Sequence, residues 1–92
     1  KESMIQETIT IINKLGLHAR AAAKLSHLAN TFVSDVYLIY NEDKVNAKSL
    51  LGILTLGAAV GKRITIETNG KDEKDAAKKI VALFNRKFDE EN

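Results

Sequence analysis

The chain has 92 residues, of which 45% are hydrophobic and 28% charged, and its formal net charge is +2. This composition predicts one globular domain over residues 1–92, and the small net charge argues against bulk electrostatic binding to nucleic acid or a membrane. The absence of cysteine excludes disulfides and thiol catalysis. Because the sequence shows neither a secretory leader nor a long apolar run, we expect a cytoplasmic protein.

The first predicted element is a β-strand at residues 5–12, where isoleucines alternate with polar side chains. A loop at 13–16 leads into a helix from about 19 to 30, in which apolar residues recur at helical spacing. Lys24 and His27 fall outside this apolar stripe and are expected to face water. The stripe consists of Ala22, Leu25, Leu28, Ala29 and Phe32.

The middle of the chain predicts a hairpin followed by a short helix. Residues 33–40 are rich in β-branched and aromatic side chains, which favour a strand, and 45–47 leave room for a short partner strand. The helix at 48–57 has Ser49 or Asn46 as its cap. It is too apolar for one buried face, so an exposed apolar patch, and with it a partner surface, is expected. Two residues among Leu50, Leu51, Ile53, Leu54 and Leu56 should stay exposed.

The last third predicts a strand at 63–69 and a final helix capped by Asp72. The acidic tail at 89–92 is predicted to be solvated and frayed. The element order β-α-β-β-α-β-α indicates an α+β fold, a two-layer open-faced sandwich whose first and last helices cover one face of the sheet. The buried stripe of the final helix is expected to be Ala76, Ala77, Ile80, Leu83, Phe84 and Phe88.

A histidine stands where the first long helix is predicted to begin. Gly16 can adopt unusual backbone angles, and His18 opens a run of helix-forming residues. The first N–H groups of a helix lack intrahelical partners, and the helix dipole favours an anion there. His18 is therefore a candidate nucleophile for a phosphoryl group; the alternative is a histidine that only caps the helix.

Two other polar residues lie at predicted helix starts. Arg20 is a cation where the dipole disfavours one, which pairing with a bound anion would explain, although an arginine reaching into water is the alternative. Ser49 is most simply a cap, but a hydroxyl at a helix start also suits phosphorylation. No metal site is expected, because His18 and His27 are nine residues apart and no acidic cluster accompanies either in the sequence.

Two motifs resemble the HPr family, the histidine-containing phosphocarriers of the bacterial sugar phosphotransferase system. Gly16–Ala22 (GLHARAA) is similar to the active-site signature, and Val45–Gly57 to the second signature of the family. Residues 82–89 also resemble NPr, the nitrogen-branch paralogue. The chain departs from the family at Ala21, where proline is usual; alanine keeps its N–H and a freer φ, so we expect function to survive with an altered transfer rate.

The resemblance implies sheet order 1-4-2-3 and a phosphocarrier that is not an enzyme, needs no cofactor and acts as a monomer. His18 would accept the phosphoryl group through Nδ1 from the phosphohistidine of enzyme I and pass it to IIA-type permease components. The positive helix end is expected to favour a neutral imidazole, and Arg20 to hold the phosphoryl oxygens. The family's docking face matches Ala19, Arg20, His27, Leu50, Leu51 and Leu54.

The resemblance also implies a regulatory role for Ser49, and two other functions are considered beside the carrier. Ser49 matches the site that HPr kinase/phosphorylase modifies where that enzyme exists, and phosphate there should weaken partner binding. One alternative is an HPr-like regulatory binding module outside sugar transport. Another, a small nucleic-acid binder, is disfavoured by the modest charge and the low aromatic content of 5%.

Overall fold

The computed structural model describes residues 4–90 and has the predicted element order. Each predicted strand and helix is present, with boundaries that differ by a few residues at most positions. After the last helix the chain makes a left-handed turn at Lys87–Asp89, here called the terminal turn. The elements are β1 (Ile5–Thr10), α1 (Ala19–Ala29), β2 (Asp35–Tyr40), β3 (Asp43–Asn46), α2 (Leu50–Leu54), β4 (Arg63–Asn69) and α3 (Glu73–Asn85).

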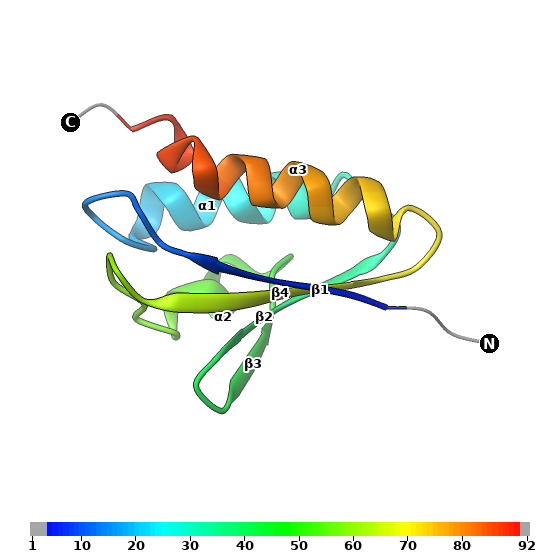
Figure 1. The fold of residues 1–92 in the computed structure, drawn as a ribbon, viewed down its shortest axis with the longest axis horizontal. Coiled ribbons are helices and arrows are strands. Elements are labelled where there is room, and N and C mark those ends of the chain that lie inside the picture. Colours follow the sequence, from blue (N-terminus) through cyan, green and yellow to red (C-terminus); the bar gives the residue numbers. More distant parts are fainter. Residues whose placement is uncertain (1–3, 91–92) are drawn as a thin grey trace.

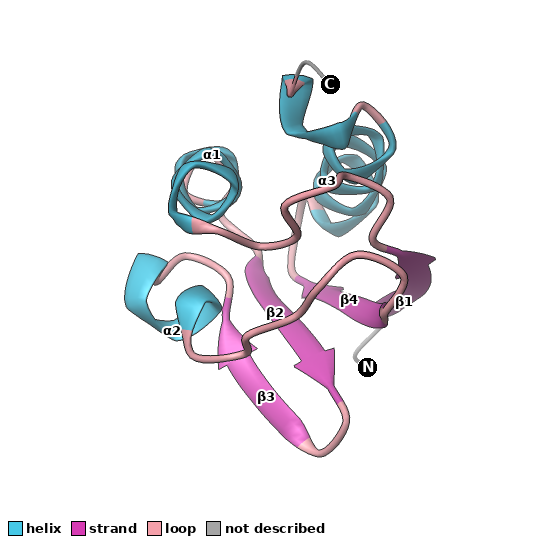
Figure 2. Ribbon diagram, turned by 90° about the vertical axis from the view of Figure 1, so that its left-hand side faces the viewer, coloured by secondary structure: helices cyan, strands magenta, loops and turns pink. Residues whose placement is uncertain are grey.

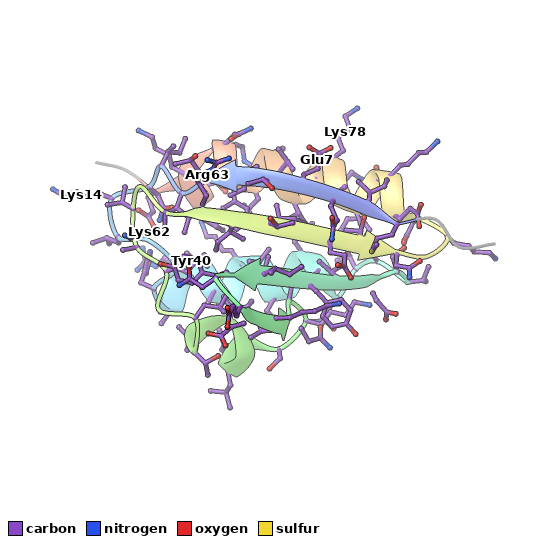
Figure 3. All side chains as sticks on the ribbon, turned by 60° about the horizontal axis from the view of Figure 1, so that its bottom comes forward. Glu7, Lys14, Tyr40, Lys62, Arg63 and Lys78 are labelled. Atoms are coloured by element: carbon purple, nitrogen blue, oxygen red, sulfur yellow. The ribbon has the colours of Figure 1, made fainter. Side chains whose placement is uncertain are left out.

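The four strands form one antiparallel sheet in the order β1-β4-β2-β3, which confirms the implied topology. Helices α1 and α3 lie side by side over one face (Figures 1 and 2), and within the described part of the chain the other face carries no helix (Figure 3). The short α2 packs beside α1 near β3, at the edge of the helical layer (Figure 2). The two-layer open-faced sandwich is therefore confirmed.

The core lies between the sheet and the two long helices. Every residue of the stripe predicted for the final helix is buried, and in α1 only Leu28 of its stripe is half-buried. In α2, Leu50 and Leu51 are 40% and 74% exposed, which confirms that two of its apolar residues stay outside the core. No helix within residues 4–90 is long and apolar enough to cross a membrane.

Asp72 stands at the N-cap position of α3, but the prediction that its side chain caps this helix is wrong. Its carboxylate instead accepts hydrogen bonds from the N–H groups of Val33 and Ser34, at 3.1 and 3.0 Å, and from the Ser34 hydroxyl at 2.5 Å. These three donors lie in the segment before β2 and satisfy the carboxylate better than one helical N–H would. The neighbouring Glu73 side chain accepts a hydrogen bond from the Gly70 N–H, at 2.9 Å.

Candidate functional site

The loop between β1 and α1 is fixed by Asn13 and Gly16. Asn13 is fully buried; its Nδ2 donates to the Gly16 carbonyl oxygen at 2.8 Å, and the Gly16 N–H donates to the Asn13 carbonyl at 3.1 Å. Gly16 has a φ of +66°, and a Cβ there would stand 2.7 Å from the Ala58 carbonyl oxygen. Both the backbone angle and the space therefore demand glycine. The loop delivers the next residues, Leu17 and His18, in a defined orientation.

His18 is the N-cap residue of α1, as the sequence predicted. Its Nδ1 accepts a hydrogen bond from the Arg20 N–H at 3.3 Å, and its carbonyl oxygen accepts one from the Ala22 N–H at 2.8 Å. Nδ1 therefore directs a lone pair at the start of the helix, which in a neutral ring leaves the proton on Nε2. Such a nitrogen can attack a phosphoryl donor, while N–H groups of the first helical turn can bind phosphoryl oxygens.

The other ring nitrogen of His18 contacts Glu90. His18 Nε2 lies 2.5 Å from Glu90 Oε2, and Asn13 Nδ2 donates to the same oxygen at 2.9 Å. The Glu90 side chain is only 9% exposed. Burial alone would raise the pKa of this carboxyl, but the hydrogen bonds from His18 and Asn13 and the imidazole charge hold it below its usual value. Glu90 is thus a carboxylate at neutral pH.

The contact with Glu90 corrects one prediction. We expected the acidic tail to be frayed, yet Glu90 is tied to His18 and Asn13. The reason is Phe88, which is buried and packs edge-on against Phe84 with ring centroids 4.8 Å apart. Burial of Phe88 holds the chain end over the start of α1 (Figure 1). Glu91 and Asn92 lie outside the described residues.

An open cleft surrounds the His18 ring, and cations line it. The Arg20 side chain is exposed and, within residues 4–90, forms no hydrogen bond or ion pair, so its guanidinium is available to an anion. Lys24 was expected to face water; instead it is half-buried, and its Nζ donates to the Phe88 carbonyl at 2.9 Å because the terminal turn lies beside α1. Besides His18 and Glu90, the cleft is lined by Lys14, Leu15, Arg20, Lys24 and the terminal-turn residues Phe88 and Asp89.

Further basic residues gather at this end of the sheet. Figure 3 shows Lys14, Lys62 and Arg63 together where β1 ends and β4 begins. The loop between β1 and α1 is joined to the loop between α2 and β4 by backbone hydrogen bonds, among them the bond from the Leu17 N–H to the Ala58 carbonyl at 3.0 Å. The local excess of positive charge favours the approach of an anionic group to His18.

Ser49 caps α2, and its Oγ accepts a hydrogen bond from the Gly52 N–H at 3.0 Å. It does not line the His18 cleft. The start of α2 lies beside the second half of α1, where Ser26 Oγ donates to the Lys48 carbonyl at 3.0 Å. About 12 Å of helix axis separates Ser26 from His18. Of the residues matched to the docking face, Ala19, Arg20, His27, Leu50 and Leu51 are exposed and Leu54 is half-buried.

Comparison with known proteins identifies the family of the chain. Residues 5–86 match the family described as "PTS HPr component phosphorylation site". Phosphocarrier protein HPr of Cupriavidus necator is 49% identical over 95% of this chain and 98% of its own length, and phosphocarrier protein NPr of Shewanella violacea is 45% identical over 94% of each.

The solved structures show the same fold. HPr of Thermoanaerobacter tengcongensis superposes with a TM-score of 0.92 at 42% identity, over 96% of this chain and 99% of that one. An HPr dimer from the same organism superposes with a TM-score of 0.76 at 43% identity, over 89% and 94%. The chain therefore belongs to the HPr family of phosphocarrier proteins of the phosphotransferase system, which are carriers and not enzymes.

Proposed function

We propose that His18 carries the phosphoryl group on Nδ1, receiving it from the phosphohistidine of enzyme I and passing it to IIA-type components. The observation that carries this assignment is the orientation of the ring, whose Nδ1 accepts from the Arg20 N–H while Nε2 contacts Glu90. Phosphoryl transfer depends mainly on positioning and charge stabilisation. A fixed lone pair at a helix start, beside a guanidinium that has no partner within residues 4–90, supplies both.

Arg20 then holds the phosphoryl oxygens, and the exposed surface of α1 and α2 docks the partners. A guanidinium binds a phosphoryl group through paired hydrogen bonds, and Arg20 has no competing partner within residues 4–90. The adjoining apolar side chains Leu50 and Leu51 are exposed and suit a protein contact. The residues assigned to docking are Ala19, His27, Leu50, Leu51 and Leu54.

Ser49 is the regulatory site in this proposal. Ser49 is exposed next to Leu50 and Leu51, so a kinase such as HPr kinase/phosphorylase can reach it. A phosphate there adds negative charge beside an apolar docking surface and weakens partner binding. We place this carrier in the cytoplasm as a monomer; sedimentation at working concentration tests the oligomeric state against the dimeric T. tengcongensis relative.

The test of the carrier assignment uses phosphoenolpyruvate and the enzyme I of the organism that supplies this chain. The wild-type protein should become an acid-labile phosphoprotein, with the phosphate mapped to His18 and not His27, and His18→Ala should abolish labelling. Heteronuclear NMR of the labelled protein should place phosphorus on Nδ1. Labelling that persists in His18→Ala, or no labelling of the wild type by a competent enzyme I, would overturn the assignment.

A further inference from the structure

The chain end supplies a side chain to the candidate site that the sequence motifs do not contain. We propose that Glu90 is a positioning residue for phosphoryl transfer: its carboxylate holds the Nε2 proton of His18, directs the lone pair to Nδ1 and balances the charge of the phosphorylated ring. The inference rests on the proposed role of His18. Glu90 touches neither donor nor phosphoryl group and acts through the imidazole.

Geometry and burial distinguish this contact from an ordinary surface ion pair. Exposed pairs contribute little to stability because water screens them and the side chains move. Glu90 is 9% exposed and His18 27%, and Glu90 Oε2 is held by two donors, His18 Nε2 and Asn13 Nδ2. Asn13 also binds the Gly16 carbonyl, so one buried amide connects the carboxylate with the loop that delivers the histidine. Ring and carboxylate are therefore aligned by the same anchor.

The backbone of the terminal turn also indicates a built contact. Lys87, Phe88 and Asp89 have φ values of +60°, +55° and +62°, and the left-handed conformation is unfavourable for residues other than glycine. Burial of Phe88, the Lys24 bond to its carbonyl and the Arg86–Asp89 pair at 3.1 Å offset this cost. The turn reverses the chain after α3 and brings Glu90 onto the ring.

The transfer step explains why a carboxylate at Nε2 matters. The Nδ1 lone pair attacks the phosphorus of a donor phosphohistidine whose ring keeps its own proton; the Nδ1–P bond forms, the donor N–P bond breaks, and the electron pair returns to the donor ring, which leaves neutral. His18 keeps its Nε2 proton, so its ring becomes a cation as Nδ1 is phosphorylated. Glu90 accepts that proton's hydrogen bond throughout and stabilises the positive charge as it develops.

The experiment compares Glu90→Ala and Glu90→Gln with Glu42→Gln, a matched loss of one carboxylate at an exposed position in the turn between β2 and β3. Rapid-quench measurements follow transfer from phosphorylated enzyme I to each protein. We expect transfer about tenfold slower in Glu90→Ala, in the range seen when a carboxylate that orients a functional histidine is removed. Glu90→Gln keeps an acceptor without the charge and should fall between Glu90→Ala and wild type, while Glu42→Gln should match wild type.

Nitrogen-15 NMR of the His18 ring separates positioning from general loss of structure. In the wild type the Nε2 proton should be visible and slow to exchange with water, and Glu90→Ala should lose that signal while its backbone amide spectrum stays folded. Wild-type transfer rates in both Glu90 variants, or an unchanged Nε2 proton in Glu90→Ala, would overturn the inference. Failure of the carrier assignment would give a different result, because the wild-type protein itself would then carry no phosphate on His18.

Discussion

The two ends of the helical layer are built from the same parts. Each has a glycine with positive φ, Gly16 before α1 and Gly70 before α3, packed against backbone from another segment. Each also has a carboxylate, Glu90 or Asp72, that fastens a segment distant in sequence. In both cases hydrogen bonds lower the pKa of the carboxyl. These shared features therefore hold segments that are distant in sequence together at each end of the layer.

The ends differ in what the carboxylate binds. Asp72 accepts from the backbone of Val33 and Ser34 and from the Ser34 hydroxyl, groups that neither titrate nor react near neutral pH. Glu90 accepts from the His18 imidazole, in a cleft that cations line. The same kind of contact is therefore part of the candidate site where one of its donors is the His18 imidazole.

The largest expected effect comes from the glycines. In Gly70→Ala the Cβ would stand 2.7 Å from the Ser34 Cα at a φ of +151°, and in Gly16→Ala it would stand 2.7 Å from the Ala58 carbonyl oxygen. Each substitution should lower the free energy of unfolding by about 1–3 kcal/mol, measured by urea denaturation. Only Gly16→Ala should also slow phosphorylation of the folded protein, because it displaces the loop that orients His18. Equal transfer rates in the two variants would show that the loop before α1 does not orient His18 for transfer.

Local pattern was sufficient to predict most of the fold and the position of His18. Period-two alternation located β4 at residues 63–69, and helical spacing located the buried stripes of α1 and α3. Gly16 followed by an alanine-rich run placed His18 at a helix N-cap before any tertiary contact was known. These features depend on neighbours within a few residues, which a sequence displays directly.

The contacts that sequence reasoning missed join residues far apart. Glu90 and His18 are 72 positions apart, and Asp72 and Ser34 are 38 apart, so no periodicity links them. The predicted burial of Phe88 was one signal that Glu90 stays close to the protein, because a buried aromatic residue restricts the positions of the next two residues. The left-handed terminal turn, which directs Glu90 toward the ring, contains no glycine, so the sequence gives no local signal for it.

An intermediate effect is expected from acid. Hydrogen bonds from the Ser34 hydroxyl and from the Val33 and Ser34 N–H groups hold the pKa of Asp72 below its usual range, and the pKa of Glu90 is also lowered. A carboxyl with a lowered folded-state pKa stabilises the fold above its unfolded pKa, about 4, and loses that contribution as the pH falls through the folded value.

Urea denaturation at neutral pH and at about pH 3 tests this assignment at both ends. The wild type should lose stability on acidification, while Asp72→Asn and Glu90→Gln should each be less stable at neutral pH and lose less in acid. Only Glu90→Gln should also alter phosphoryl transfer. An Asp72→Asn variant with the same acid sensitivity as wild type would show that the Asp72 fastening does not contribute to the fold.

The smallest expected effect on stability belongs to Arg20. Its guanidinium has no partner within residues 4–90, so Arg20→Gln should change the free energy of unfolding by less than about 0.5 kcal/mol. The matched control is Lys74→Gln, which removes an exposed cation from the first turn of α3 at the other end of the layer. Arg20→Gln should shorten the lifetime of phosphorylated His18 and slow its formation severalfold, because one charged donor to the phosphoryl oxygens is lost. If Arg20→Gln and Lys74→Gln behave alike in both assays, the phosphoryl group is held by the backbone of α1 alone, and the functional difference between the two ends reduces to the histidine and its carboxylate.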